Sequence, residues 1–407
     1  MLRIVRYRLN IHLIFLLSML ASCGPLAVDM YLPSLPSIAY YFSVKPSCVQ
    51  HTLTGFMSGF SIGMLLYGPL SDALGRRQVL LSGIALFIVS SFICFSANSI
   101  SVLIFARFME AIGAGASSVL TRTIARDTHE PENSAKVLLM VGGITSIGPL
   151  FAPLIGSQII RFSNWRAVFA FLSLFGTCCI IVAFFCIPET WPKHKHNRTA
   201  LLHSFISYRH ILSDRNVWGY ILCGGMAFAS MFSYVTASPF IYIEYFHLSP
   251  QHYAMLFGLN ISCIIFGNFL NAWLVTRVSP LRIISVASLF SSIGSLGVSF
   301  FAITGIGQLL SIVLSLFFVV SIVGVLSANC TTNLMLRYPD NAGAAAAIFG
   351  AIQLGLGALV STIISTLTNG TPSAMGITIG ISGLLCLTGR KLIFRQSKIV
   401  IKNNTRF

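Results

Sequence analysis

The sequence predicts an all-α membrane protein whose helices cross the bilayer many times. Of its 407 residues, 55% are hydrophobic and only 9% are charged, whereas soluble proteins carry about 25% charged residues. Apolar stretches of roughly 20 residues, long enough to cross the hydrocarbon core, recur along the chain. Because these stretches are continuously apolar and do not alternate, they indicate helices rather than the strands of a barrel.

The chain holds twelve such stretches, arranged as two sets of six. In chain order they are 10–32, 51–70, 79–97, 99–121, 137–160, 166–187, 217–243, 252–276, 283–303, 307–330, 343–366 and 374–390. They predict an N-terminal six-helix bundle at 1–187, a linker at 188–216, a C-terminal six-helix bundle at 217–390 and a tail at 391–407. The basic start resembles a signal peptide, but 21–29 holds no convincing small-residue cleavage site, which favours a retained first helix.

The lysines and arginines predict the orientation of the chain. Of the 26, the segments on the side of both termini hold 22, the opposite loops hold three, and Arg107 lies inside a helix. By the positive-inside rule, both termini, the linker and the tail are cytoplasmic, as expected for a multi-pass protein of a bacterial inner membrane. Attraction to anionic inner-leaflet lipids explains the net charge of +16 better than nucleic-acid binding does.

Several classes of function are not supported by the motifs present. The sequence contains no GxxxxGK[ST] loop for ATP and no GxSxG nucleophile motif, so no enzyme and no cofactor is expected. Nine of the ten cysteines lie in apolar stretches and no CxxC pair exists, which favours packing roles. The run KHKH at 193–196 could hold a metal, but alternating polar residues in a loop are more often solvated, and no metal site is expected.

Two of the ten acidic residues, Asp29 and Glu110, lie within predicted spans. A charged side chain at the centre of a spanning helix costs about 2.5–3.5 kcal/mol, so such an acid is a functional hypothesis by default. Pro33 and Pro36 follow Asp29 and are expected to weaken or end the helix there. Asp29 is therefore a candidate proton carrier; the alternative is an exposed acid at the outer end of the helix.

Arg107 and Glu110 stand three residues apart on the fourth helix and can pair on one face. A buried arginine needs such a partner. Either the pair is static and fixes helix packing, or Arg107 tunes the protonation of Glu110. The small residues of "GAGASS" at 113–118 follow and permit close approach of a neighbouring helix.

The fifth helix carries a smooth face with two bends. In "GPLFAPLIG" (148–156), Gly148, Ala152 and Gly156 recur every four residues, while Pro149 and Pro153 each remove a backbone donor. A similar stripe occurs in the eleventh helix, at an offset of about 200 residues, which indicates a duplicated six-helix unit. The stripes predict either tight packing or interfaces that slide.

Charge is concentrated in one ten-residue stretch, "GPLSDALGRR" (68–77), and this stretch resembles the signature loop of the major facilitator superfamily. "RFMEAIGAG" (107–115) and "GPLFAPLIG" resemble motifs of its fourth and fifth helices. "DMYLPSLP" and "ASPFIYIEYFHLSP" (237–250) are similar to the bicyclomycin-resistance (Bcr/CflA-type) subfamily of drug:proton antiporters. The resemblance covers about 24 to 360. It departs from the family at Glu110, where glutamine is usual, and at the Gly156–Ser157 pair, where the family usually has Gly-Gly.

The resemblance implies a major facilitator fold and a cytoplasmic latch between the halves. Gly68 and Gly75 would permit a tight turn, and Asp72 would meet a helix N-terminus of the other half, where an anion is favoured. Arg76 and Arg77 begin the third helix, where the helix dipole disfavours a cation. They are expected to be held by acids such as Asp127 or by anionic lipid.

Together these features predict a monomeric, proton-driven exporter of small, largely apolar or cationic compounds that works by alternating access. Protons and a small-molecule substrate are its expected partners. Alternatives are a metabolite exporter or facilitator of the same fold, and a transporter-fold receptor without turnover. The side chains predicted to line a central cavity are Tyr31, Phe60, Tyr234, Asn260, Phe266 and Gln353.

Overall fold

The computed structural model describes residues 11–192, 199–368 and 370–404, and over these ranges the chain is helical with short connections and no strand. Two compact units divide the chain, unit 1 at Met1–Ser204 and unit 2 at Phe205–Phe407. The KHKH run at 193–196 and the basic residues 1–10 lie outside the described residues.

The helices follow the predicted spans in number and order. Those up to the linker are α1 (Ile11–Ala21), α2 (Cys23–Asp29), η1 (Leu32–Ser34), α3 (Leu35–Phe42), α4 (Pro46–Leu74), α5 (Arg76–Phe95), α6 (Ile100–Thr128), α7 (Pro131–Phe162) and α8 (Trp165–Cys186). The remainder are α9 (Ala200–Ser213), α10 (Arg215–Pro239), η3 (Phe240–Tyr245), α11 (Pro250–Leu274), α12 (Pro280–Thr304), α13 (Gln308–Arg337), η4 (Pro339–Asn341), α14 (Ala342–Leu367) and α15 (Ser373–Asn404). Over the described residues, eleven are long and apolar enough to cross a membrane, and α1 with the bent stretch after it supplies a twelfth span.

The first span is broken beside Asp29, as the prolines predict. Helix α2 ends at Asp29, η1 contains Pro33, and α3 begins with Pro36 in its first turn. The stretch Cys23–Phe42 is bent by 41° from α1. Beyond the predicted end of the span near residue 32, the chain continues helically to Phe42, because a proline in the first turn of a helix is tolerated. Asp29 therefore lies between helical segments on both sides and not at the end of the helical stretch.

The signature stretch at 68–77 is mostly helix. Helix α4 continues to Leu74, and Gly75 alone separates it from α5, with a φ of 104° that a side chain would disfavour. The prediction that Gly68 shapes a turn is wrong, since Gly68 lies inside α4 and a Cβ there would meet nothing within 4 Å. A helix can continue from the bilayer into water, so the end of an apolar run does not mark the end of the helix.

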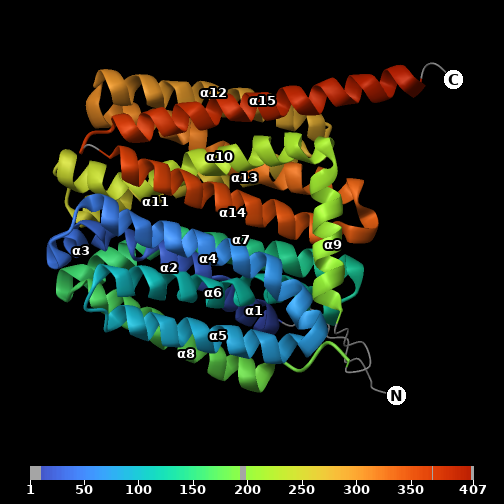
Figure 1. Ribbon diagram of the computed structural model, residues 1–407, viewed down its shortest axis with the longest axis horizontal. Helices are drawn as coiled ribbons and strands as arrows, with labels where there is room; N and C mark the ends of the chain where they lie inside the picture. The colour runs from blue at the N-terminus through green and yellow to red at the C-terminus, as the bar shows by residue number, and fades with distance from the viewer. Residues whose placement is uncertain (1–10, 193–198, 369, 405–407) are drawn as a thin grey trace. The chain divides into compact units, whose positions relative to one another are not determined.

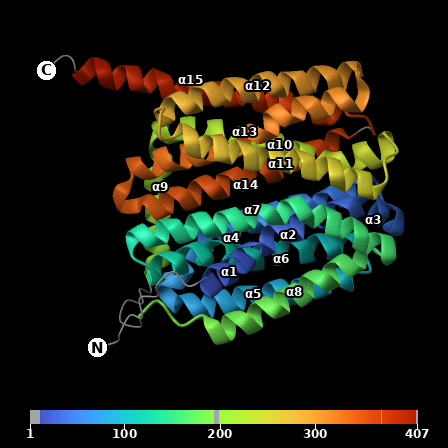
Figure 2. The same ribbon diagram turned by 180° about the vertical axis from the view of Figure 1, so that it is seen from behind.

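Small residues set the helix spacing in unit 1. A Cβ on Gly113 of α6 would lie 2.5 Å from the backbone nitrogen of Phe87 in α5. A Cβ on Gly59 of α4 would lie 2.3 Å from the carbonyl oxygen of Phe108. The close approach expected from "GAGASS" is thus present, and α6 packs between α4 and α5 (Figure 1). On the other side of the unit, α7 runs along α1 and α2 (Figure 2).

In unit 2, α10 is the central helix: with η3 it forms a largely buried span that packs on α13, α14 and α15. Asp214 caps α10 and accepts hydrogen bonds from the Arg337 Nε (2.9 Å) and the Tyr338 hydroxyl (2.7 Å). Partial burial opposes the charged form of Asp214, but the Asn216 N–H and these two donors outweigh it and hold its pKa below the ordinary value. The start of α10 is thereby fixed to the end of α13.

Candidate functional site

The most buried charge in unit 1 is the Arg107–Glu110 pair on α6. Both side chains are fully buried, and the Arg107 Nη1 lies 2.6 Å from the Glu110 Oε2. Glu110 also accepts a hydrogen bond from the Ser91 hydroxyl of α5 at 2.7 Å. The predicted partnership is therefore present, with a third member that the sequence did not indicate.

Aromatic rings complete the surroundings of Arg107. The guanidinium carbon lies 4.3 Å from the ring centre of Phe56, 4.8 Å from that of Tyr31 and 5.7 Å from that of Phe169. Such rings attract a cation through their negative faces, and the attraction strengthens where water is absent. The Nε and Nη2 atoms of Arg107 have no hydrogen-bond partner among the described residues. The rings thus supply part of the stabilisation that acceptors usually give.

Tyr31 connects this pocket to the broken first span. Its hydroxyl bonds to the Thr52 hydroxyl of α4 at 2.9 Å, and its ring faces Arg107. Asp29 lies two residues earlier, where α2 ends. Its side chain is 8% exposed and makes no hydrogen bond or ion pair within the described part of the chain.

Helix α7 touches the backbone directly after Asp29. A Cβ on Gly156 would lie 2.1 Å from the carbonyl oxygen of Met30, so only glycine fits at this contact. Ala152, one turn earlier, is fully buried, whereas a Cβ on Gly148 would meet nothing within 4 Å. Pro149 and Pro153 lie inside the helix as predicted. The smooth face of α7 therefore meets the candidate proton carrier at its Gly156 end.

A second polar cluster surrounds the break at Gly75. The Arg76 side chain pairs with Asp72 and, through Nε at 3.2 Å, with Asp127 in the last turn of α6. The pairing expected between Arg76 and Asp127 is present. Arg77 instead donates to the carbonyl oxygen of Phe184 at 2.6 Å, with its guanidinium near the ring of that residue.

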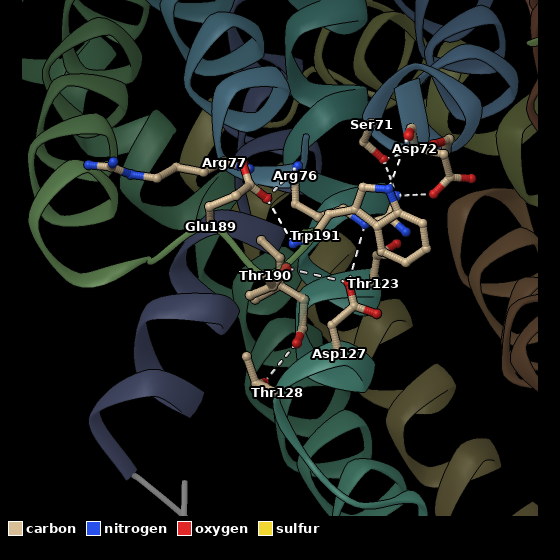
Figure 3. A network of polar contacts seen from close by, with 12 residues as sticks. Ser71, Asp72, Arg76, Arg77, Thr123, Asp127, Thr128, Glu189, Thr190 and Trp191 are labelled. Atoms are coloured by element: carbon tan, nitrogen blue, oxygen red, sulfur yellow. Dashed lines mark hydrogen bonds and ion pairs between the residues drawn. The ribbon is translucent and has the colours of Figure 1, made fainter. Parts of the chain in front are cut away.

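Glu189, which follows α8, was not expected in this cluster. Its carboxylate accepts hydrogen bonds from the backbone N–H groups of Arg76 (2.9 Å) and Arg77 (3.2 Å), the first residues of α5 (Figure 3). An anion at a helix N-terminus satisfies free donors and complements the dipole. The same Glu189 lies 2.7 Å from the position of a Cβ on Gly75, which is a second reason for glycine there.

Trp191 covers the other side of Arg76. The indole N–H donates to the Asp72 carbonyl oxygen at 3.1 Å, and the Arg76 guanidinium carbon lies 4.6 Å from the centre of the indole ring (Figure 3). Thr190, between them in sequence, donates to Asp127 at 3.4 Å. The start of the linker is thus bound to the signature stretch. The feature of the sequence that could have indicated this role of Glu189 is its position just after the end of an apolar stretch.

We expect Glu189→Ala to loosen the start of α5 without unfolding unit 1. Loss of an N-terminal acceptor costs about 1 kcal/mol, and the loss of the dipole interaction adds a few tenths. Amide hydrogen exchange at Arg76 and Arg77 should therefore accelerate about tenfold. Glu189→Gln, whose amide oxygen can still accept one bond, should show a smaller effect, and Glu244→Ala, which removes an exposed acid of unit 2, should show none. Unchanged exchange in Glu189→Ala would contradict the cap.

The side chains proposed to line a cavity do not share one environment. Tyr31 is buried against Arg107, and Phe60 is half-buried beside Gly24 and Phe56. In unit 2, Tyr234 and Asn260 are hydrogen-bonded to each other at 3.2 Å.

The other two predicted cavity residues, Gln353 and Phe266, have different surroundings. Gln353 exchanges hydrogen bonds with Ser327, and Phe266 is 68% exposed. Of the four predicted cavity residues in unit 2, Tyr234 and Asn260 are in direct contact with each other.

Comparison with known proteins shows which family and which relatives this sequence resembles. The family model of the Major Facilitator Superfamily matches residues 17–362. An uncharacterized MFS-type transporter, YdgK of Bacillus subtilis, is 34% identical over 360 residues, covering 87% of this chain and 89% of its own length. The bicyclomycin resistance protein homolog of Haemophilus influenzae is 30% identical, with coverages of 90% and 92%. Multidrug resistance protein D of Escherichia coli is also 30% identical, with coverages of 92% and 94%.

Solved structures share the fold at lower identity. A bacterial homolog of the lysosomal transporter Spinster superposes with a TM-score of 0.74 at 14% identity, covering 96% of this chain and 97% of its own. A D-xylose-proton symporter gives a TM-score of 0.70 at 17% identity, with coverages of 92% and 97%. At these identities the likeness concerns the arrangement of helices alone.

Proposed function

This chain belongs to the major facilitator superfamily, and we propose that it is a proton-coupled multidrug exporter of a bacterial inner membrane. It exchanges protons for small, largely apolar or cationic compounds by alternating access, as a monomer with both termini in the cytoplasm. The observation that carries the proposal is Asp29, a buried acid without a bonding partner among the described residues, at a helix break within the first predicted span. Relatives named for bicyclomycin and multidrug resistance support the choice of substrate.

Asp29 is suited to carry a proton because nothing holds its charge. A carboxyl group in dry surroundings keeps its proton, and the same group in contact with water releases it. The break after α2 and the contact of Gly156 with Met30 make the backbone around Asp29 dependent on the position of α7. A proton that enters down a potential of about 100 mV gains roughly 2.3 kcal/mol, which can drive export.

The cluster at Gly75 supports a role as a cytoplasmic latch. Arg76 is only 7% exposed, whereas Asp72, its neighbour, is 37% exposed and keeps a face open to solvent in unit 1. Glu189, Trp191 and Asp127 hold the arginine in a fixed position. In this proposal the exposed Asp72 forms and breaks the contact that closes the latch, and Arg76 keeps the same position throughout.

A second candidate function, export of a polar metabolite, is favoured by the amide and hydroxyl groups of unit 2. Gln353 and Ser327 exchange hydrogen bonds at 2.9 and 3.1 Å, and the Asn329 amide donates to Asn271 at 2.7 Å. Several hydrogen-bonding side chains are what a polar solute requires. The two candidates differ in which compounds move protons.

The test is substrate-driven proton movement in proteoliposomes with an imposed pH gradient, reported by a trapped dye. We expect planar cations and apolar toxic compounds to dissipate the gradient, and sugars and amino acids not to do so. Vesicles without protein correct for passive permeation. Dissipation by polar metabolites alone would replace the main proposal by the second candidate, and dissipation by no compound would contradict both.

A further inference from the structure

Unit 2 contains a closed group of aromatic rings that includes Tyr234, one of the side chains predicted to line a cavity. Tyr234 of α10 stacks on Phe257 of α11, with ring centres 5.7 Å apart and planes at 17°. Tyr242 of η3 lies 6.2 Å from Tyr234 and 6.0 Å from Tyr253 of α11. All four rings are at most 1% exposed. They therefore form one apolar, flat-sided group inside a single unit.

Two polar atoms in this group have no hydrogen-bond partner among the described residues, the Tyr242 hydroxyl and the Asn260 amide oxygen. The Asn260 side chain is fully buried, and its amide nitrogen donates to the Tyr234 hydroxyl and to the Leu256 carbonyl oxygen, both at 3.2 Å. Since a carbonyl oxygen can only accept, the bond to Leu256 fixes which end of the amide is nitrogen. The amide oxygen, Oδ1, is left buried without a hydrogen-bond donor among the described residues. A buried acceptor of this kind requires an explanation, because proteins rarely leave one unsatisfied.

The backbone beside the rings is irregular as well. Residues Phe240–Tyr245 form a π-helix, in which the Phe246 N–H reaches back five residues to the Ile241 carbonyl oxygen. Single π-helical turns are rare and are frequently found at functional sites. Tyr242 is the ring that this turn carries, so a change in the local winding would displace Tyr242 from its neighbours.

The geometry points to a substrate subsite within unit 2 for planar aromatic compounds that carry an N–H donor. When the group is open, the ring system of the ligand stacks on the face of Tyr234 or Phe257, and its N–H donates to the Asn260 Oδ1. The inference rests on the proposed export function and narrows its substrate class. It predicts discrimination by a single hydrogen, since a ligand without the donor leaves the buried acceptor unpaired.

Carbazole and N-methylcarbazole form a matched probe pair, because the two tricycles differ only in the N–H. Binding is measured by fluorescence with the full-length protein in lipid nanodiscs, after subtraction of empty nanodiscs. The wild-type protein should bind carbazole about tenfold more tightly than N-methylcarbazole. Asn260→Leu should abolish this preference. Asn333→Leu, which removes an amide of the same unit outside the ring group, should keep it.

A ring variant separates stacking from hydrogen bonding. Phe257→Leu should weaken both probes by about fivefold and leave their ratio unchanged. Equal affinities in the wild-type protein, or a preserved preference in Asn260→Leu, would overturn the subsite. This binding needs no proton coupling, so Asp29→Asn should retain it. If the wild-type protein moves protons but does not prefer carbazole to N-methylcarbazole, the subsite alone is refuted. If it prefers carbazole but no compound drives proton movement, the export proposal alone is refuted.

Discussion

Asp29→Asn is expected to stop substrate-driven proton movement while the protein folds normally. Asparagine has nearly the same shape as aspartate but cannot carry a proton. A positioned proton-transfer group contributes about a hundredfold or more to a rate, so the proton flux should fall by roughly that factor. Stability should change by no more than about 1 kcal/mol, because Asp29 has no ion pair or hydrogen bond to lose in the described part of the chain.

The measurement compares the collapse of a pH gradient in proteoliposomes for the wild-type protein and the variant, at equal reconstituted amounts. Asp340→Asn is the matched control: it makes the same chemical change at an exposed position of η4, at the very start of the candidate span Pro339–Leu367. The control should transport like the wild-type protein. A variant at Asp29 that still dissipates the gradient at the wild-type rate would move the search for the carrier to Glu110.

The parts of this molecule that the sequence predicted are those that depend on local chemistry. The thickness of a bilayer limits the length of an apolar run, so the spans could be counted before any helix was seen. The three-residue spacing of Arg107 and Glu110 places them on one face of any helix. Because the chain contains few acidic residues, Asp127 could be named in advance as a partner for Arg76.

What could not be predicted comes from contacts between helices that are distant in sequence. Phe56 and Phe169 meet Arg107 from α4 and α8, and no spacing rule brings them there. Glu189 reaches the start of α5 across more than one hundred residues of chain. The prediction that Gly68 shapes a turn failed for a different reason. Hydropathy indicates where the lipid ends, whereas the helix α4 continues beyond that point.

The second large effect concerns the buried pair on α6. Arg107→Gln alone should lower the free energy of unfolding by about 3–5 kcal/mol, because it leaves the Glu110 carboxylate buried with the Ser91 hydroxyl as its one remaining donor among the described residues. Glu110→Gln alone should cost a similar amount. Two of the Arg107 nitrogens already lack acceptors among the described residues, and the three aromatic rings would be its main remaining stabilisation.

The double variant Arg107→Gln with Glu110→Gln should recover most of this loss, since it buries no charge and two amides can bond to each other and to Ser91. Recovery should stop short of the wild-type value by about 1–2 kcal/mol, the contribution of the lost contacts between the cation and the rings of Tyr31 and Phe56. Unfolding measured on the three variants gives the coupling energy directly. A double variant as unstable as Arg107→Gln alone would refute the pairing.

Transport by the double variant then decides what the pair does. Glu110 is enclosed by Arg107 and Ser91 and has no exposed surface, whereas Asp29 retains some exposure and has no bonded neighbour among the described residues. We therefore expect the pair to be static. Its arginine supports the ring of Tyr31, two residues from the carrier, and the double variant should keep most of the proton flux. A double variant that folds with near-normal stability but moves no protons would instead make Arg107 and Glu110 part of the proton path, with the arginine setting the protonation of the acid.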